Sequence, residues 1–278
     1  MTMKFTILCA NSAATASSVI AEHGFACYLE SEAGNYLFDT GQGLGIVHNA
    51  IILKKDLSKI QAIMLSHGHY DHTGGLAKVL QMVGETTVYA HPDIFAKKYK
   101  KTQEREKYVG IPFSRAYLES LGANFQLSTE LIEIGRNIYL TGQVPRLNNF
   151  EKGDGNLFAY THTGDKIQPD PLKDDLSVIV DSDRGLVIVF GCAHAGMINI
   201  INHALKSLNK NKIYAVMGGT HLMASSDAQF TETLKMINEY EIKHVGVSHC
   251  TGLEKASLLH ANLKDRFFFA SVSTEFEV

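Results

Sequence analysis

The sequence predicts an α/β fold in which strands and helices alternate in a layered sandwich. Three observations predict it: apolar runs of strand length recur along the 278 residues, segments with helical spacing lie between them, and glycine-rich loops follow several strands. The composition, 45% hydrophobic and 20% charged, is that of a globular chain with an ample core. We therefore interpret residues 1–278 as one domain with two similar halves, about 1–143 and 174–278.

The first half opens with short β-rich runs separated by turns. Residues 4–9, 25–30, 36–39 and 59–65 are predicted strands, and Gly34 and Asn35 are predicted to form a hairpin turn. Apolar residues at helical spacing predict helices over 45–53 and 76–83, and 86–90 returns to strand. Strand and helix therefore begin to alternate before residue 90.

Two segments interrupt this alternation. Residues 97–115 mix lysines with tyrosines and glutamates, which favours an inserted mobile lid or, equally, a solvated helix or loop. The lysines that a lid could close over a charged substrate are Lys97, Lys98, Lys100 and Lys101. Residues 144–173 hold three prolines and are predicted to form an irregular connection between the halves.

The second half repeats the order of strand, loop and helix. Predicted strands at 176–181 and 185–190 are joined by a polar hairpin turn at 182–185. Helices are expected over 197–208, 228–240 and 253–263, with strands at 213–217, 244–247 and 266–269. No sequence repetition accompanies the repeated order of elements.

Composition excludes several classes of function. The chain has 26 Lys and Arg against 29 Asp and Glu, a net charge of −3. It therefore lacks the excess of positive charge that attracts nucleic acid. Apolar runs fall far short of the roughly 20 residues of a membrane helix, and no export signal opens the chain. We expect a cytoplasmic protein whose four scattered cysteines are reduced.

The strongest chemical signal is Ser-His-Gly-His-Tyr-Asp-His-Thr-Gly-Gly at residues 66–75, between a predicted strand and a predicted helix. Residues two apart at a strand end point the same way, so His67 and His69 can share one metal ion. The turn then directs Asp71 and His72 toward a second ion. Two ions that each lack further protein ligands keep positions open for water, which is typical of catalytic sites.

Two further histidines occupy the same local context. His194, in Gly-Cys-Ala-His-Ala-Gly at 191–196, follows one predicted strand, and His249, in Ser-His-Cys-Thr-Gly at 248–252, follows another. A lone histidine is commonly a packed residue, but here the context between strand and helix recurs. We predict that His194 and His249 supply the ligands that the two metal sites still lack.

The motifs together resemble the metallo-β-lactamase fold superfamily of metal-dependent hydrolases over nearly the whole chain. The HxHxDH cluster is that superfamily's most specific motif, and Phe-Asp-Thr-Gly at 38–41 matches its early aspartate, here Asp39. With the segments at 141–146, 191–196, 218–222 and 248–252, the chain resembles the branch grouped around a dihydropterin ribofuranosyl-aminobenzene phosphate synthase. The resemblance implies a four-layer αββα sandwich with a dinuclear metal site. It also implies that Asp39 supports the ligand loop of that site by hydrogen bonds.

The chain departs from the superfamily at the aspartate that usually bridges the two metals. Gly191 and Cys192 stand where that residue is expected. Cys192 can take its place, the Asp174-Asp175 pair can supply a carboxylate, or water alone can bridge. We favour Asp175, and the other interpretation of Cys192 is a buried small apolar residue.

The expected charge of the centre favours an anionic substrate. Two divalent ions carry +4, and Asp71 and a bridging hydroxide leave +2 if no second carboxylate binds, which suits a phosphate ester. His221, in a glycine-rich turn, can donate a proton to a leaving oxygen or hold a phosphate, or it can pack against the following helix. The resemblance puts Arg146 near the site, where its guanidinium suits phosphate or carboxylate.

We therefore predict a dinuclear metal-dependent hydrolase of a small anionic, phosphate-containing ester, with Asp71 and His221 in catalytic roles. Zinc suits nitrogen-rich ligation best, and manganese or iron also bind such sites. The alternatives are a transferase that joins a pterin to an aminobenzene ribofuranosyl phosphate, and a non-enzymatic or redox metal protein. No nucleic-acid or membrane partner is expected, and β-lactam hydrolysis is disfavoured because no export signal is present.

Overall fold

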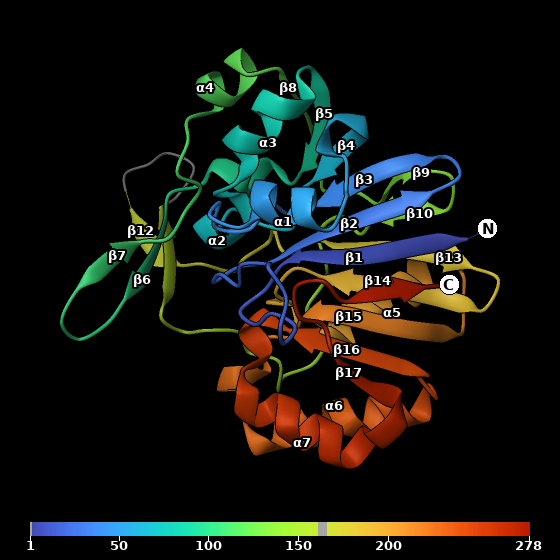
Figure 1. Cartoon of the computed structure of the whole chain (residues 1–278). Coiled ribbons are helices and arrows are strands. Elements are labelled where there is room, and N and C mark those ends of the chain that lie inside the picture. The colour runs from blue at the N-terminus through green and yellow to red at the C-terminus, as the bar shows by residue number, and fades with distance from the viewer. Residues whose placement is uncertain (1, 161–165) are drawn as a thin grey trace.

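Two seven-stranded sheets pack face to face in the computed structural model, which describes residues 2–160 and 166–278, and helices cover their outer faces (Figure 1). The strand order is β18-β1-β2-β3-β4-β5-β8 in the first sheet and β17-β16-β15-β14-β13-β10-β9 in the second. The predicted α/β sandwich is therefore confirmed, with the four layers in the order αββα.

The first sheet and its helices come mainly from the first half. Its strands are β1 (Met3–Cys9), β2 (Ala26–Ser31), β3 (Gly34–Phe38), β4 (Ile60–Met64), β5 (Thr86–Ala90), β8 (Ala123–Leu127) and β18 (Glu275–Glu277). The helices are α1 (Ile46–Ile52), α2 (Tyr70–Thr73), α3 (Leu76–Val83) and α4 (Arg115–Ser120), with 3₁₀ turns at Leu57–Lys59 and Pro92–Phe95. The predicted hairpin turn at Gly34 and Asn35 is wrong, because both residues pair within β3 and the turn lies at Glu32 and Ala33.

The second sheet and its helices come mainly from the second half. Its strands are β9 (Ile132–Gly135), β10 (Ile138–Leu140), β13 (Ser177–Ser182), β14 (Gly185–Phe190), β15 (Ile213–Gly219), β16 (His244–Ser248) and β17 (Phe267–Phe269). The helices are α5 (Met197–Ser207), α6 (Asp227–Glu239) and α7 (Leu253–Leu263), with 3₁₀ turns at Leu222–Ala224, His249–Thr251 and Lys264–Arg266. The halves exchange edge strands, since β9 and β10 join the second sheet and β18 joins the first.

Successive side chains of each central strand pack into different layers of the sandwich. In β14, Val187 and Val189 face the core between the two sheets, whereas Ile188 and Phe190 face α5, α6 and α7. All four side chains are fully buried. Since successive residues of a strand point to opposite faces, an apolar run without polar interruption is what a strand covered on both faces requires.

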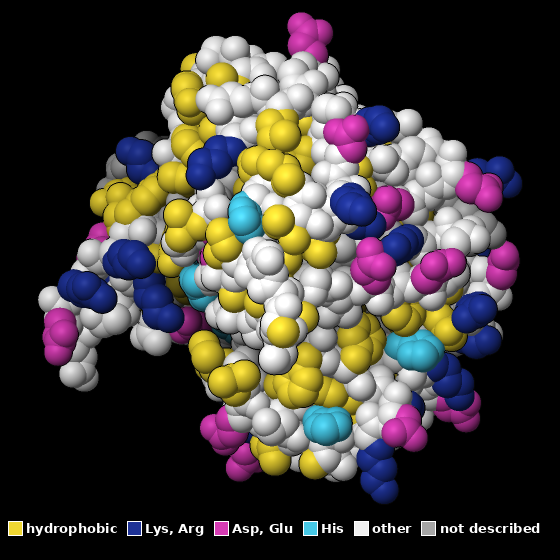
Figure 2. Space-filling view, in the orientation of Figure 1, with side chains coloured by type: hydrophobic (Ala, Val, Ile, Leu, Met, Phe, Trp, Pro, Cys, Tyr) yellow, Lys and Arg dark blue, Asp and Glu magenta, His cyan; other side chains and the backbone are white. Residues whose placement is uncertain are grey.

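A third, four-stranded sheet lies beside the sandwich, in the order β12-β11-β6-β7 (Figure 1). It joins β6 (Lys98–Lys101) and β7 (Glu106–Tyr108) to β11 (Leu157–Tyr160) and β12 (Ile167–Pro169). The segment 97–115 and the connection 144–173 are therefore one paired structure, although residues 161–165 of the connection lie outside the described residues. Basic side chains gather on the protruding hairpin of β6 and β7 (Figure 2), but Lys98 is buried.

From the central strand to one edge of each sheet the strands are parallel: β3, β4, β5 and β8 in the first sheet, and β14, β15, β16 and β17 in the second. The carboxyl ends of parallel strands meet at one edge of a sheet, so the loops that follow them lie together. In the part of the chain that the structure describes, no helix is long and apolar enough to cross a membrane.

Candidate metal centre

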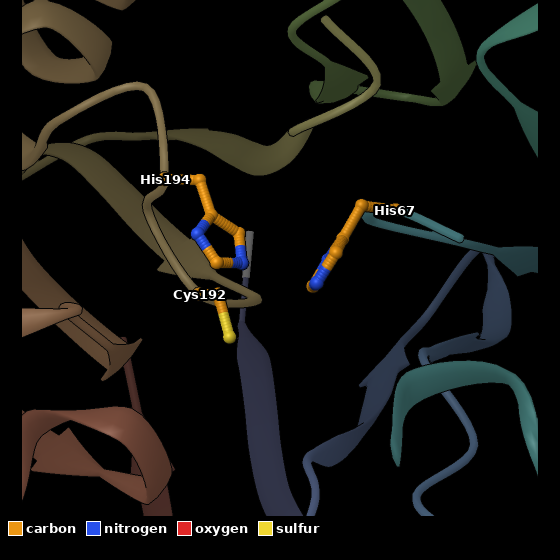
Figure 3. A group of neighbouring side chains, drawn as sticks. All are labelled: His67, Cys192 and His194. Atoms are coloured by element: carbon orange, nitrogen blue, oxygen red, sulfur yellow. The ribbon is translucent and has the colours of Figure 1, made fainter. Parts of the chain in front are cut away.

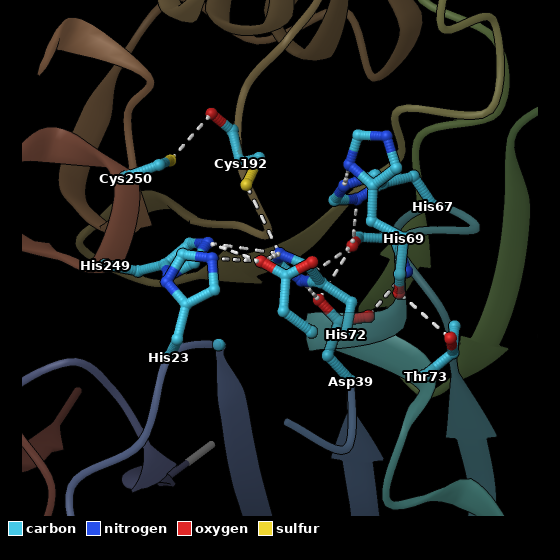
Figure 4. Close-up of polar contacts among 12 residues, drawn as sticks. His23, Asp39, His67, His69, His72, Thr73, Cys192, His249 and Cys250 are labelled. Atoms are coloured by element: carbon cyan, nitrogen blue, oxygen red, sulfur yellow. Dashed lines mark hydrogen bonds and ion pairs between the residues drawn. The ribbon is translucent and has the colours of Figure 1, made fainter. Parts of the chain in front are cut away.

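The loops after five strands bring the predicted ligands to one edge between the sheets (Figure 4). Asp39 follows β3, and the segment 66–72 follows β4. Cys192 and His194 come after β14, His221 after β15 and His249 after β16. Because all these elements end at the same edge, side chains far apart in sequence form one group, which is buried except for the half-buried His221.

Four non-glycine residues in these loops adopt left-handed backbone conformations. Asp39, Ala193, His221 and His249 have φ angles of 59°, 54°, 51° and 48°. Such conformations cost an L-residue roughly 1–3 kcal/mol and persist where the surrounding structure imposes them, often at functional sites. Each one turns the chain sharply just after a strand.

One cluster, here called the His72 cluster, contains Asp71, His72 and His249. The Nε2 atoms of His72 and His249 are 3.3 Å apart, and Asp71 Oδ2 lies 3.3 Å from His249 Nε2 and 3.8 Å from His72 Nε2. The thiol sulfur of Cys192 is 3.2 Å from His72 Nε2. Four potential ligand atoms therefore converge in the His72 cluster.

The outer nitrogens of the His72 cluster have hydrogen-bond partners. Asp39 Oδ2 lies 2.6 Å from His72 Nδ1, while its carboxylate accepts from both the amide and the hydroxyl of Ser66 at 2.7 Å. Asn11 Oδ1 lies 2.8 Å from His249 Nδ1. Each contact leaves Nε2 directed into the cluster, as outer partners of metal-bound imidazoles do.

The other cluster, here called the His67 cluster, contains His67, His69 and His194. His67 Nε2 lies 2.9 Å from His69 Nδ1, and Ser66 Oγ is 2.9 Å from His67 Nδ1. The His194 ring lies 4.9 Å from that of His67 and 5.2 Å from that of His69. Neither His194 nitrogen, nor His69 Nε2, has a hydrogen-bond partner among the described residues, although all three atoms are buried.

Burial gives these imidazoles the protonation state that metals bind. Desolvation, with contributions from neighbouring imidazoles, lowers the pKa of His67 and His194 well below the usual value. Desolvation also lowers the pKa of His69, to about 3. The rings are therefore neutral near pH 7, which leaves lone pairs free for a cation.

The carboxylate of Asp71 is ionised for a different reason. Burial by itself raises the pKa of Asp71, but the neighbouring His72, His23 and His249 outweigh it and lower that pKa well below the usual value. Burial would lower the pKa of His72, but Asp39 and Asp71 raise it to about 9. Without a metal ion, the negative charge of the Asp71 carboxylate is therefore balanced by the positive charge of the His72 imidazole.

Two contacts at this edge had no signal in the sequence. Asn11 follows β1, and His23 lies before β2 with its Nε2 3.2 Å from Asp71 Oδ2. About half of the His23 side chain is exposed, at 52%. Neither residue belongs to a motif or to a strand-to-helix loop, so only the packing of the N-terminal segment against the His72 cluster identifies them.

The other predicted site residues have different neighbours. The Arg146 guanidinium donates to the carbonyls of His194 at 2.6 Å and Pro171 at 2.9 Å. Asp175 Oδ2 accepts from the Ala195 amide at 2.8 Å, while Oδ1 has no partner among the described residues. His221 lines a small cavity of about 20 Å³ together with His194 and Glu151, and the His221 and His194 rings are 4.3 Å apart.

Comparison with known proteins agrees with this fold. The profile of the metallo-beta-lactamase superfamily matches residues 21–232. The chain is 29% identical, over 89% of its length and 87% of the other's, to a 7,8-dihydropterin-6-methyl-4-(beta-D-ribofuranosyl)-aminobenzene-5'-phosphate synthase of Methanocaldococcus jannaschii.

Solved structures give the same result. Tm1679, described as a metal-dependent hydrolase of the beta-lactamase superfamily, is 28% identical with a TM-score of 0.85, and 99% of each chain is covered. The metallo-beta-lactamase fold protein YhfI of Bacillus subtilis is 12% identical with a TM-score of 0.61, over 100% of this chain and 99% of the other, and shows the fold alone.

Proposed function

This chain belongs to the metallo-β-lactamase superfamily, and we propose that it is a dinuclear metal-dependent hydrolase of a small anionic, phosphate-containing ester. The observation that carries the proposal is the pair of histidine clusters. They offer buried imidazoles, which burial keeps neutral in the His67 cluster, and His194 has no hydrogen-bond partner among the described residues to satisfy either ring nitrogen. A buried polar atom without a partner costs about 1–3 kcal/mol, which a bound cation would offset.

The residues present fit two metal ions. With bonds of about 2.0–2.2 Å from the metal to nitrogen and oxygen, neighbouring ligand atoms on a tetrahedral ion are about 3.3–3.6 Å apart. The three separations within the His72 cluster are 3.3, 3.3 and 3.8 Å, close to this spacing before any ion is bound. His67, His69 and His194 would hold one ion, and Asp71, His72 and His249 the other.

When bound, two divalent ions would supply Lewis acidity and lower the pKa of a water molecule toward neutrality. The protein's own part is to hold and orient. Asp39 fixes the tautomer of His72, and Asn11 orients His249. The carboxylate of Asp71 accepts contacts from His23 and His249, which keeps the Asp71 side chain directed into the His72 cluster.

His221 is the proposed proton donor to the leaving oxygen. Its ring nitrogens have no hydrogen-bond partner in the described part of the chain, and the ring lines the cavity next to His194. The cavity has room for about one water-sized group, so a single oxygen placed there would lie near both side chains. A positioned imidazole of this kind contributes typically 10²–10⁴-fold to a proton-transfer step.

Lys107 supports the choice of an anionic substrate. It is exposed on β7, and its ammonium lies 5.0 Å from the centre of the Tyr70 ring. Tyr70 separates His69 from Asp71, so a positive charge is held beside the ligand segment. Arg146 stays a candidate for the same role, although its guanidinium already donates to two backbone carbonyls.

The experiment that tests the hydrolase proposal is an initial-rate assay with an aryl phosphodiester. Protein reconstituted with zinc or manganese is compared with chelator-treated protein. Turnover that the chelator abolishes and added metal restores is the expected result. Protein that holds two ions per chain and turns over no phosphodiester would contradict the phosphoesterase proposal, and would direct the search to carboxylic esters or group transfer.

The second candidate is a transferase that joins a pterin to an aminobenzene ribofuranosyl phosphate. The observation that favours it is the 29% identity to the M. jannaschii synthase over 89% of the chain. Both reactions need a cationic centre and a site for a phosphate. A product assay separates them, because hydrolysis consumes only water, whereas transfer requires a pterin diphosphate as co-substrate and forms a conjugate.

A further inference from the structure

Cys192 lies where the two histidine clusters meet. Its side chain is buried, with 3% of the residue exposed. The sulfur, His67 and His194 offer three ligand atoms that all lie within 4.8 Å of one another (Figure 3), and the same holds for the sulfur with His72 and His249 (Figure 4). One sulfur is therefore close to the ligand atoms proposed for both ions.

The neighbours of Cys192 offer no better bridge. A Cβ atom on Gly191 would lie 2.3 Å from Ser66 Oγ, so no side chain fits at that position. Asp175 is fully buried, and its Oδ2 accepts a hydrogen bond from the Ala195 amide, which ties this oxygen to the backbone of the His194 loop. The sulfur, in contrast, points into the space between the clusters (Figure 4).

The spacing of the sulfur also suits a ligand. Cys192 Sγ and His72 Nε2 are 3.2 Å apart, near the roughly 3.5 Å expected for sulfur and nitrogen on one tetrahedral zinc ion. A second, independent observation comes from His194, whose two buried nitrogens have no partner among the described residues. Its ring belongs to the same group of ligand atoms as the sulfur.

We propose that the Cys192 sulfur bridges the two metal ions as a thiolate. This inference rests on the proposed dinuclear site, and it replaces our expectation that Asp175 is the bridge. On binding, the S–H bond breaks, the proton passes to solvent, and the sulfur donates electron pairs to both cations, so no oxidant or reductant is needed. A soft thiolate selects zinc or iron(II) over manganese, which prefers oxygen ligands.

Cobalt(II) titration of the full-length protein tests the bridge without any substrate. A thiolate bound to cobalt(II) gives an intense near-ultraviolet charge-transfer band, which imidazole and carboxylate ligands do not give. A bridging sulfur bonds both ions, so we expect the band to grow through the second equivalent of cobalt. A band that stops growing after one equivalent, while a second ion binds, would overturn the bridge.

Variants assign the band to one sulfur. Cys250 is the matched control, because its sulfur is also buried and lies 3.5 Å from the Cys192 carbonyl oxygen. We expect Cys192→Ala to lose the band and Cys250→Ser to keep it. A band that persists in Cys192→Ala, or disappears in Cys250→Ser, would overturn the assignment.

Two further variants decide between sulfur and carboxylate. Cys192→Asp should bind two ions without the band, and its affinity for zinc relative to manganese should fall at least about tenfold, as expected when oxygen replaces sulfur. Asp175→Asn should keep both the band and two ions. If Asp175→Asn binds one ion while Cys192→Ala still binds two, Asp175 is the bridge.

The titration also separates this inference from the proposed function. Two bound cobalt ions without a charge-transfer band in the unmodified protein would overturn the thiolate bridge and leave a dinuclear centre. A protein that binds no cobalt under any condition would overturn both.

Discussion

The His72 cluster and the His67 cluster share Cys192 as a neighbour, but they are held in different ways. In the His72 cluster, Asp39 and Asn11 contact the outer nitrogen of each imidazole. In the His67 cluster, Ser66 contacts only His67, and His194 has no partner among the described residues. The His72 cluster is therefore preorganised by protein contacts, whereas in the His67 cluster the proposed ion would have to satisfy the nitrogens that the protein leaves without partners.

The difference extends to the backbone that carries each cluster. Only His67 of the His67 cluster has an outer side-chain partner, but the backbone of its loop is also held, because Asp174 accepts a hydrogen bond from the Gly68 amide at 2.8 Å. Lys98 donates to Asp174 and Asp170 at 2.8 Å each. The small third sheet thus supports the ligand loop of the sandwich through one buried lysine.

The largest effect is expected from removing one ligand of either cluster. Asp71→Ala removes the carboxylate of the His72 cluster, and His69→Ala removes an imidazole of the His67 cluster. Each variant should bind at least one metal ion fewer and lose nearly all turnover, measured by metal analysis and by the phosphodiester assay.

His260→Ala is the control for these variants, since His260 is an exposed histidine on α7. It should keep full metal content and activity. A fully metallated and fully active Asp71→Ala or His69→Ala protein would contradict the assignment of that cluster as a metal site.

The next effect concerns the support of the His67 loop. Lys98→Met leaves two buried carboxylates without their cation and should lower the free energy of unfolding by about 3–5 kcal/mol. Urea denaturation of the metal-free protein measures it. Lys97→Met, at the exposed neighbouring position, should change stability by less than about 0.5 kcal/mol.

The stability defect of Lys98→Met should also depend on pH, in a direction that the pKa of Asp174 determines. Burial raises the pKa of Asp174, but Lys98 outweighs it and lowers that pKa in the folded protein. Without Lys98, burial would raise the pKa above its unfolded value, so the folded state would bind more protons and gain stability as pH falls. The defect of Lys98→Met should therefore shrink between pH 7 and pH 4; a constant defect would mean that charge is not its cause.

A smaller effect is expected from the outer partners of the His72 cluster. Asp39→Asn removes the negative charge that faces His72 and should weaken metal binding by about 10–100-fold. Asn11→Ala, which removes a neutral partner of His249, should weaken binding less. Competition with a chromogenic chelator measures both, and equal affinities for the unmodified protein and Asp39→Asn would show that preorganisation contributes nothing.

The smallest effect is expected at the edge of the His72 cluster. Lys107→Ala removes an exposed charge beside Tyr70 and should raise KM for an anionic substrate a few-fold at unchanged kcat, because it affects binding alone. Added salt should reduce the difference between the two proteins. A change in kcat with unchanged KM would contradict a role in substrate binding.

Much of the fold was predictable because burial determines which positions of a strand or helix are apolar, and this pattern is visible in the sequence. The strand at 86–90 and the helices at 76–83 and 253–263 match β5, α3 and α7 residue for residue. The hairpin turn was misplaced by two residues, since glycine pairs at the start of β3 rather than turning. The segment 97–115 could not be predicted as sheet, because β11, the partner of its strand β6, lies about sixty residues farther along the chain.

By itself, the sequence determined the layered α/β class and the residues of the His-x-His-x-Asp-His segment, since periodicity and ligand spacing are local properties. Only the tertiary structure decided which other side chains contact these ligand residues. Contacts of Asn11 and His23 with the His72 cluster, of Lys98 with the loop support, and of Cys192 with both clusters join residues from separate elements. Such contacts depend on how strands and loops pack in space, and no local pattern encodes a distance between segments a hundred residues apart.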